Sequence, residues 1–426
     1  MVRINPFRPN HPINTGMFVG RLNEVNKLEA ALLQTRAGQP SNFMITGERG
    51  IGKTSLLAYM KYVAVGDIAI ESEKVSFLVI ETDVDENTTQ VGLVRKIELG
   101  LRRELGKTEK ARKWFSGAWD FLQRVEAGGI SLKEATTTDS DLVIEEFAYS
   151  LAETVNRVTQ ASVDDTFSTR YDGLLILVDE ADNASSALSL GAFLKMLLER
   201  LQRHGCEKVM VGLAGLPELR QVLLDSHPSS LRLFEELPLG RLSDPEVERV
   251  IDRCLLRANE ENSEKTTITN DAKKALANLA EGYPHFIQQF GYCAFAVDDD
   301  GEITAKDVIE SALGKRGGLE IIGDRYYRNN FYNKIQKESY RQVLRIMAEK
   351  DDGWIAKSEI KDKFQGKEST LDNAIQALRE RHIILSQEGQ RGIYRLQHRG
   401  FALWIKLYTA DKSQLQQVSL DDLSKA

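Results

Sequence analysis

The stretch Gly47-Glu48-Arg49-Gly50-Ile51-Gly52-Lys53-Thr54 decides how this chain folds. It fits the pattern G-x-x-x-x-G-K-[ST] at every fixed position, and it lies between an apolar strand candidate, Phe43 to Thr46, and a helix candidate that opens at Ser55. The glycines allow backbone angles at which successive N–H groups turn toward an anion at a helix N-terminus. The alternative is a glycine-rich turn with a chance lysine, but the flanking strand and helix favour a phosphate-binding loop.

The side chains of this loop have expected roles in binding nucleotide phosphates. Lys53 supplies positive charge to the β- and γ-phosphates, and the Thr54 hydroxyl is placed to ligate Mg²⁺. The loop therefore predicts ATP and Mg²⁺ as ligands. Its expected nucleotide-binding residues are Gly47, Glu48, Arg49, Gly50, Ile51, Gly52, Lys53, Thr54 and Ser55.

A second motif follows a continuous apolar run, Leu174 to Val178, which is typical of a parallel strand buried on both faces. The run ends in Asp179 and Glu180. Asp179 can hold the Mg²⁺ shell through water, and Glu180 can polarise an attacking water as general base. The alternative is a buried strand with an acidic exit turn, which the complete phosphate-binding loop disfavours. Together the two motifs predict an enzyme that hydrolyses ATP to ADP and phosphate.

Composition narrows the class of protein. The chain has 426 residues, 42% of them hydrophobic, which suffices for a large core and predicts about two to three domains. The formal net charge of −7 argues against a protein that is basic throughout and coats nucleic acid. Cys206, Cys254 and Cys293 lack C-x-x-C spacing, so we expect neither disulfides nor a zinc site. Neither a signal peptide nor an apolar run of membrane-spanning length is present, which predicts a soluble, cytoplasmic protein.

A further segment precedes the loop: Phe18-Val19-Gly20-Arg21, followed by Glu24 and an amphipathic helix pattern. This F-V-G-R-x-x-E entry ahead of G-E-R-G-I-G-K-T resembles the AAA+ ATPases, especially the branch of the origin-recognition and cell-division-control initiators and the neighbouring STAND-type ATPases. The resemblance implies an α/β P-loop core with a parallel sheet, a helical lid and a C-terminal winged helix. It also places Phe18, Val19 and Gly20 against the adenine base. Without it, the segment could be a hydrophobic staple at a helix entry.

Two departures from the AAA+ pattern favour the STAND side of this branch. The apolar run from Lys208 to Gly215 reads as a strand that in the family ends in a polar sensor of the γ-phosphate, but Ala214 and its neighbours cannot sense one. In the lid, the place of a sensing arginine is held by His285. A histidine there could contact phosphate, and a structural role is an equal alternative.

An arginine for a neighbouring subunit is also implied by the resemblance. Arg232 lies just before the last core strand, where AAA+ proteins place an arginine that reaches the γ-phosphate of the next subunit. Such a residue would stabilise transition-state charge and make hydrolysis depend on a homo-oligomer. Arg220 is a second candidate, and a surface salt bridge is the alternative for Arg232.

A basic, aromatic segment lies between the second and third strand candidates. From Arg95 to Arg124 the chain carries nine Lys and Arg against four acids, together with Trp114, Phe115 and Trp119. Such a segment could bind nucleic acid by phosphate contact and stacking. We favour the alternative, a solvated helical insertion whose aromatic side chains are buried.

The C-terminal part has a different charge, because Lys and Arg number 17 and Asp and Glu 11 between Gly323 and Thr409. Its pattern of three helices and a hairpin resembles the winged helix of initiator-type ATPases, whose third helix can enter a major groove and whose wing can meet phosphate. Winged helices also bind proteins, so an effector protein is the alternative partner. The residues expected to contact double-stranded DNA are Lys367, Asn373, Gln376, Arg379, Arg391 and Arg395.

These observations predict a nucleotide-dependent switch that associates with DNA, or a STAND-like regulatory or defence ATPase that binds a partner protein. An inactive scaffold is disfavoured by the intact Asp179-Glu180 pair. The expected parts are an extended arm (1–17), an AAA+ core (18–240) with a helical insertion at about 88–172, a helical lid (241–313), a glycine-rich linker (314–323), a winged helix (324–410) and an acidic tail (411–426).

Overall fold

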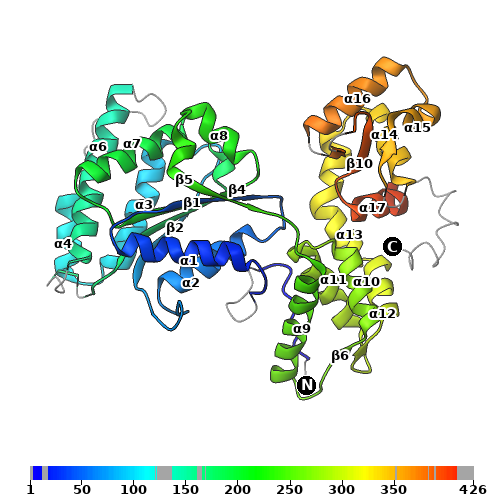
Figure 1. Cartoon of the computed structure of the whole chain (residues 1–426), viewed down its shortest axis with the longest axis horizontal. Coiled ribbons are helices and arrows are strands. Elements are labelled where there is room, and N and C mark those ends of the chain that lie inside the picture. The colour runs from blue at the N-terminus through cyan, green and yellow to red at the C-terminus, as the bar shows by residue number, and fades with distance from the viewer. Residues whose placement is uncertain are drawn as a thin grey trace. The chain divides into compact units, whose positions relative to one another are not determined.

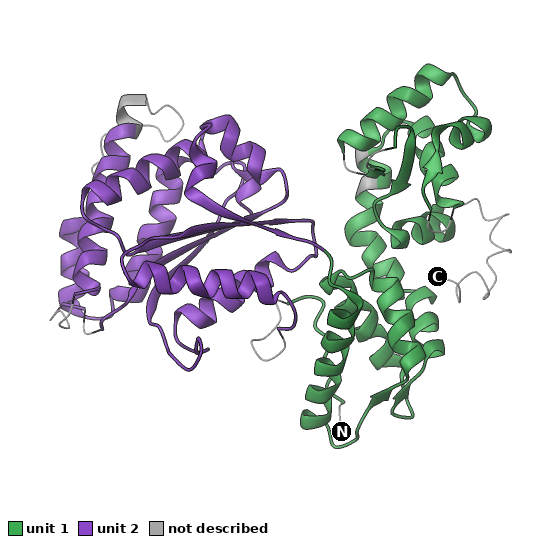
Figure 2. Cartoon of the chain, viewed as in Figure 1, with its two compact units in different colours: residues 1–13, 241–426 green, residues 14–240 purple. Residues whose placement is uncertain are grey.

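The chain folds into two compact units in a computed structural model. One unit comprises residues 14–240, and the other comprises residues 1–13 with 241–426 (Figure 2). The structure describes residues 3–11, 18–119, 121, 137–160, 166–167, 169–350, 353–381, 383–387 and 390–409.

The first unit is built on a parallel five-stranded sheet in the order β2-β3-β4-β1-β5, which confirms the expected α/β class. Its strands are β1 (Asn42–Gly47), β2 (Phe77–Asp83), β3 (Gly173–Asp179), β4 (Val209–Gly215) and β5 (Phe234–Leu239). Its helices and 3-10 turns are α1 (Leu22–Arg36), α2 (Lys53–Ala64), α3 (Gln90–Leu105), α4 (Glu109–Ala118), α6 (Thr137–Val158), η2 (Ala181–Asn183), α7 (Leu190–Arg203), α8 (Leu219–Ser226) and η3 (Ser230–Leu233).

Both faces of this sheet are covered. In Figure 1, α1 and α2 lie on one side of the strands and α7 and α8 on the other. Because side chains alternate along a strand, a sheet covered in this way needs apolar residues at every position. Strand β3 satisfies this requirement, since the whole run from Gly173 to Val178 is buried.

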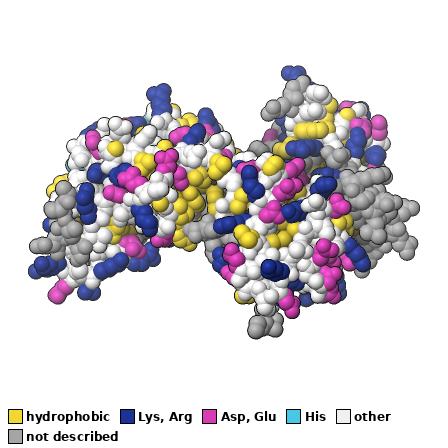
Figure 3. Space-filling model, turned by 60° about the horizontal axis from the view of Figure 1, so that its bottom comes forward, with side chains coloured by type: hydrophobic (Ala, Val, Ile, Leu, Met, Phe, Trp, Pro, Cys, Tyr) yellow, Lys and Arg dark blue, Asp and Glu magenta, His cyan; other side chains and the backbone are white. Residues whose placement is uncertain are grey.

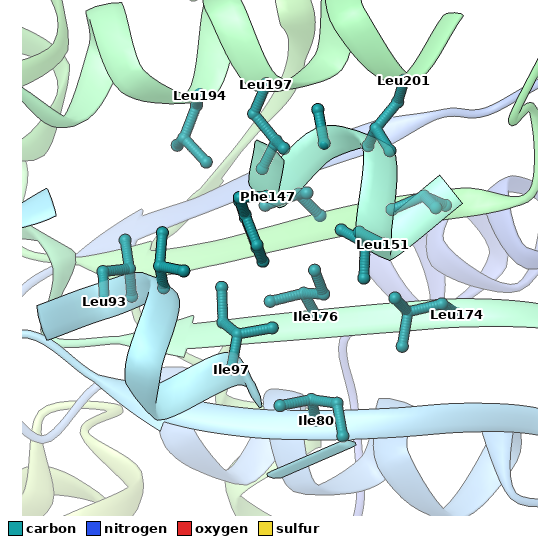
Figure 4. Close-up of a cluster of buried hydrophobic side chains, with 14 of the residues drawn as sticks. Ile80, Leu93, Ile97, Phe147, Leu151, Leu174, Ile176, Leu194, Leu197 and Leu201 are labelled. Atoms are coloured by element: carbon teal, nitrogen blue, oxygen red, sulfur yellow. The ribbon is translucent and has the colours of Figure 1, made fainter. Parts of the chain in front are cut away.

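The core on one face joins strands to the helices of the insertion. Figure 4 shows Ile80 of β2 and Ile176 of β3 beneath Phe147 of α6 and Leu197 of α7. The aromatic residues of the basic segment join the same cluster, where Phe115 is fully buried and Trp119 is 2% exposed. Burial of such side chains stabilises a fold by about 1.5–3 kcal/mol each. These aromatic side chains are therefore not available to stack on nucleic acid, which supports the helical-insertion interpretation.

The second unit begins with a group of helices that follows the first unit in sequence. It comprises α9 (Asp244–Glu261), β6 (Thr267–Ile268), α10 (Asn270–Ala280), α11 (Pro284–Val297), β7 (Glu302–Ile303) and α12 (Ala305–Leu313). Two of these helices start in capping boxes, formed by Ser243 with Glu246 and by Thr304 with Asp307. The paired side chains satisfy backbone groups that a helix end leaves open and so define where each of these helices begins.

The remainder of this unit combines helices with a small antiparallel sheet. Its elements are α13 (Gly318–Ile322), the π-helical turns η4 (Gly323–Tyr327) and η5 (Asn329–Lys334), α14 (Glu338–Ala348), β8 (Ile355–Ala356), α15 (Lys357–Lys363), α16 (Glu368–Glu380), β9 (Ile384–Ser386), β10 (Ile393–Leu396) and α17 (Arg399–Thr409). Strand β10 pairs antiparallel with both β8 and β9. The predicted order of three helices and a hairpin is present, whereas the expected acidic tail lies outside the described residues.

The expected glycine linker at 314–323 differs from what the structure shows. Its second half forms α13, in which Leu319 is fully buried. Gly318 lies so close to Phe290 of α11 that an added Cβ would come within 2.7 Å of the ring. These glycines therefore serve close packing between helices, a use that composition does not separate from flexibility.

The N-terminal segment packs on the helices of the second unit. Residues 3–8 have no regular secondary structure, as the prolines predict. Arg3 forms an ion pair with Asp298, whose side chain is 1% exposed, and Phe7 is 2% exposed. The Phe7 ring lies on Gly291 of α11, where an added Cβ would come within 2.4 Å of Phe7 Cε1. The segment is thus an integral part of this unit.

We predict that Phe7→Ala lowers the free energy of unfolding of this unit by about 3 kcal/mol, because it leaves a cavity over Gly291. Urea unfolding followed by circular dichroism measures the change. Ile4→Ala is the matched control: this side chain is 46% exposed on the same segment, so its loss should cost less than about 0.5 kcal/mol. Equal effects of the two substitutions would contradict the packing of Phe7.

Candidate nucleotide-binding site

The glycine-rich loop connects β1 to α2 and bends back over the start of the helix. Gly50 has φ 81° and Gly52 has φ 103°, both in the left-handed region that favours glycine. Gly52 directly precedes α2, a helix of 12 residues, so the first backbone N–H groups of the helix face the loop. Free N–H groups and the helix dipole make such an N-terminus suited to anions.

Lys53 is held by the loop itself. Its ammonium donates hydrogen bonds to the carbonyl oxygens of Gly47 at 2.8 Å and of Glu48 at 3.0 Å. Burial lowers the pKa of Lys53 from its ordinary value, while the charges of Asp182 and Asp179 oppose this shift. The lysine is thus positioned over the loop, where it could transfer its hydrogen bonds to phosphate oxygens.

The two predicted Mg²⁺ ligands lie in direct contact. Thr54 Oγ1 donates a hydrogen bond of 2.8 Å to Oδ2 of Asp179, which ends β3. A hydroxyl and a carboxylate oxygen fit Mg²⁺, which takes one or two protein oxygens and otherwise water and phosphate. Over the described residues there is no group of three or more His, Cys, Asp or Glu side chains that could hold a metal by themselves.

Glu180 is exposed and has an unusual backbone. Its φ of 53° lies in the left-handed region, which a non-glycine residue rarely adopts. Its N–H donates to Asp179 Oδ1 at 2.8 Å, and Asn183 Nδ2 donates to its Oε2 at 3.4 Å. Such strain persists where the surroundings enforce it, often at functional sites. Glu180 follows the Thr54–Asp179 contact directly in the chain, and Asn183 contacts its carboxylate.

The segment before α1 also lies against the loop and α2. The Phe18 ring stacks on Tyr59 of α2 with centroids 5.0 Å apart, while Val19 and Gly20 are half-buried. Arg21 donates to the carbonyl oxygens of Ile51, at 3.3 Å, and of Gly240. The predicted adenine-contacting segment and the phosphate-binding loop are therefore adjacent. The contact from Arg21 to the loop was not predicted, although the residue belongs to the quoted motif.

The end of β4 supplies no polar side chain of its own, as the sequence indicates. Its last residues, Leu213, Ala214 and Gly215, are apolar and buried. Asp182 of η2 lies there instead, and its Oδ1 accepts a hydrogen bond of 2.9 Å from the N–H of Leu216. Sequence reasoning missed this residue. The only available signal was its position, three residues after Asp179.

The two candidate arginines for a neighbouring subunit differ in their surroundings. Arg232 is exposed on η3, and no ion pair to its side chain forms within the described part of the chain. Arg220 forms an ion pair of 2.5 Å with Glu236 of β5. Arg232 is thus the better placed of the two for contact with another subunit.

His285 belongs to the second unit, whereas the phosphate-binding loop belongs to the first. The histidine is half-buried and packs against Tyr326, with ring centroids 5.4 Å apart. Burial and the charge of Arg325 lower the pKa of His285 to about 4, so the ring is neutral near pH 7. A neutral, packed imidazole favours the structural alternative over a phosphate contact.

The predicted DNA-contacting residues gather around α16 and the small sheet. Arg395 is half-buried, and its guanidinium lies 5.0 Å from the centroid of the Trp354 ring, so it is less accessible than the other members of the set. On the face drawn in Figure 3, Lys and Arg side chains are interspersed with Asp and Glu side chains. The remaining members of the set are all exposed: Lys367, Asn373, Gln376, Arg379 and Arg391.

Two further observations concern the class of protein. Across the described ranges, no helix is long and apolar enough to cross a membrane. Cys206, Cys254 and Cys293 are free thiols, as their spacing predicts.

Comparisons with known proteins agree with this geometry. Residues 17–211 match the family model described as "AAA ATPase domain". No curated protein matches the sequence. The ORC2 protein of Aeropyrum pernix in its ADPNP-ADP complexes is similar in structure, with a TM-score of 0.53 at 14% identity over 92% of this chain and 93% of that chain. At this identity the likeness concerns the fold alone.

Two other solved structures cover the chain with lower scores. The ORC1 protein of Aeropyrum pernix in complex with DNA gives a TM-score of 0.42 at 16% identity, over 96% of this chain and 93% of that chain. Cdc6p from Pyrobaculum aerophilum gives 0.41 at 11% identity, over 93% and 94%. The loop, the acidic pair and the first three strands of the parallel sheet thus lie within the part of the chain, residues 17–211, that matches the model of an AAA ATPase domain, and the fold is similar to that of the ORC2 protein.

Proposed function

We propose that the chain is a nucleotide-dependent switch that binds ATP with Mg²⁺ and hydrolyses it to ADP and phosphate. The observation that carries this proposal is the 2.8 Å contact between Thr54 and Asp179, with Glu180 adjoining it. This contact joins the helix after the phosphate-binding loop to the end of β3. It places oxygen ligands for a metal next to a lysine and a possible base.

Each residue has a distinct task in this mechanism. Lys53 and the N–H groups at the start of α2 bind and orient the phosphates. Bound Mg²⁺ would neutralise phosphate charge, with Thr54 and Asp179 as its protein partners. Glu180 orients the attacking water and accepts its proton, while Asn183 keeps the carboxylate in place. Phe18 and its neighbours would lie against the base.

We expect Glu180→Gln to lower the rate of ATP hydrolysis by a factor of about 10² or more while ATP still binds, because only the proton acceptor is lost. Lys53→Ala should abolish binding. Phosphate release and the fluorescence of a labelled ATP measure the two steps. The control is Glu207→Gln, an exposed acid ahead of β4 at the opposite edge of the sheet. Unchanged hydrolysis in Glu180→Gln would exclude this residue as the base.

We also propose that Arg232 acts on the nucleotide of a second copy of the chain, so that hydrolysis depends on a homo-oligomer. The exposure of Arg232 next to β5 supports this assignment. A cation placed on the γ-phosphate would stabilise charge that develops in the transition state.

For Arg232→Ala we predict a fall in hydrolysis of about 10²-fold or more, with ATP binding retained. In the unmodified protein, hydrolysis per chain should rise with protein concentration as subunits assemble, which sedimentation can follow. Arg203→Ala is the charge-matched control, since Arg203 is an exposed arginine at the C-terminal end of α7 to which no role is assigned. Full activity of dilute, monomeric protein would rule out the role of Arg232.

For the C-terminal part we propose a winged helix that contacts double-stranded DNA through α16 and the β9–β10 hairpin. Asn373, Gln376 and Arg379 lie on the exposed face of α16, and such side chains can read base edges. Lys367 and Arg391 would contact phosphates, and Arg395 less readily because of its packing on Trp354.

A protein partner is the second candidate, and the charge of α16 favours it. The helix carries Glu368, Asp372 and Glu380 against a single arginine. Asp372 pairs with Lys357, and Glu368 pairs with Lys361 at 2.9 Å, so several basic side chains are already engaged. A surface of mixed charge suits a protein better than a polyanion.

We predict that Arg379→Ala and Arg391→Ala each weaken binding to random-sequence duplex DNA and reduce its salt dependence by about one released ion. Fluorescence anisotropy across a salt series measures both quantities. Lys315→Ala removes an exposed charge elsewhere in the same unit and should change neither. Absence of binding at every salt concentration, with hydrolysis indifferent to DNA, would direct the search to a protein effector.

A further inference from the structure

The second unit contains an apolar pocket to which the proposed function gives no task. It lies between α10, α12 and α17, and α10 contacts both of the other helices. Its volume of about 340 Å³ falls at the lower end of the range of small-molecule sites. Its apolar wall consists of six half-buried side chains: Ala275, Leu279, Ala305, Ile309, Leu313 and Leu403. The pocket can therefore receive an apolar body.

The charged side chains that line the apolar pocket do not cancel one another. Lys274 and Asp271 of α10 lie 3.8 Å apart and oppose each other in charge. Arg399, the first residue of α17, also lines the pocket, and within the described ranges its side chain has no hydrogen bond or ion pair. Its guanidinium is thus an uncompensated positive charge beside an apolar wall. A carboxylate complements that charge, because its two oxygens match the paired N–H groups of an arginine.

A carboxylate from the chain itself holds the start of α17 in place. Glu281 directly follows α10, and its Oε1 accepts a hydrogen bond of 3.0 Å from the N–H of Gly400. Its Oε2 pairs with Arg241 at 3.1 Å. The charge of Glu281 is therefore satisfied by these partners. The same contacts fix the backbone next to Arg399, so this arginine is positioned at the pocket before any ligand binds.

A second, polar pocket adjoins the apolar one. Arg399 and Asn278 line both, so the arginine lies at their boundary. The polar pocket has a volume of about 360 Å³, and its charged lining residues are more often basic than acidic: Arg241, Lys350, Arg395 and Arg399 against Asp244 and Glu281. A ligand whose apolar body fills the first pocket can thus keep an anionic end at Arg399, next to further positive charge.

We propose that the apolar pocket between α10, α12 and α17 binds a small amphipathic carboxylate, a medium-chain aliphatic acid. The chain lies against Ile309, Leu313 and Leu403, and the carboxylate accepts hydrogen bonds from Arg399. Removal of the chain from water supplies affinity, while the arginine supplies preference for an acid over an uncharged molecule. The pocket belongs to the second unit and the phosphate-binding loop to the first, so this inference does not rest on ATP hydrolysis.

The test measures binding of sodium octanoate to the full chain by ligand-detected NMR, with two matched probes. Acetate keeps the carboxylate without the chain, and octan-1-ol keeps the chain without the charge. We expect octanoate to bind about tenfold or more tightly than either probe, as for the loss of a hydrogen bond to a charged group. Equal binding of octan-1-ol would overturn the role of Arg399, and equal binding of acetate would overturn the role of the apolar wall.

Two substitutions locate the site. Arg399→Gln should weaken octanoate about tenfold and leave octan-1-ol unchanged, because it removes only the charged partner. Ala275→Phe should abolish octanoate binding by filling the pocket from α10. Arg249→Gln is the matched control, since it changes an exposed arginine on α9 that lines neither pocket. Thermal unfolding confirms that each variant folds. Unchanged octanoate binding in folded Arg399→Gln and Ala275→Phe, or no binding to the unmodified chain, would overturn the inference.

Discussion

The parallel pairing of β1 with its neighbours is the constraint on which the site depends. In a parallel sheet all strands end at the same edge, so registers that pair Thr46 with Gly215 and Val178 with Leu213 place the ends of β1, β3 and β4 together. Both faces are covered by helices, which leaves this edge as the place where loops can hold polar groups. The Thr54–Asp179 contact is a consequence of that pairing, because it joins residues that follow two different strands.

The sequence could predict those parts of the site that are local. The loop, its strand and its helix adjoin one another in the chain, and the run before Asp179 is apolar at every position because both faces of β3 are buried. Asp182 could not be found in this way, since its contact with Leu216 requires the end of β4, which follows in the chain only after the crossover through α7. Arg395 was expected to contact DNA, but its packing on Trp354 is a tertiary contact without a local signal in the sequence. The glycines of 314–323 were interpreted as a flexible linker for a similar reason. Glycine occurs both in flexible segments and where helices pack closely, and composition does not separate the two.

The N-terminal segment is part of the second unit, although its composition indicates only an extended arm. Residues 3–11 belong to the second unit, although the first unit follows them and ends only at Gly240. The Arg3–Asp298 pair and the packing of Phe7 therefore close a loop of the chain that contains all residues of the first unit. Contacts between such distant residues form late and at an entropic cost, so they must be well satisfied to persist. The nearly complete burial of Asp298 and Phe7 meets that requirement.

The hydrogen bonds that Lys53 already makes limit how much this residue can contribute to nucleotide affinity. Its ammonium already donates to the carbonyl oxygens of Gly47 and Glu48, so a phosphate that accepts these protons replaces existing hydrogen bonds. Such an exchange of one hydrogen bond for another contributes little to the free energy of binding. Even a typical intramolecular hydrogen bond contributes only about 0.5–1.5 kcal/mol net, because it replaces hydrogen bonds to water. Affinity must then come chiefly from the free N–H groups at the start of α2 and from charge. Because burial lowers the pKa of Lys53 and nearby carboxylates raise it, the acids around the loop help to keep the lysine charged for that purpose.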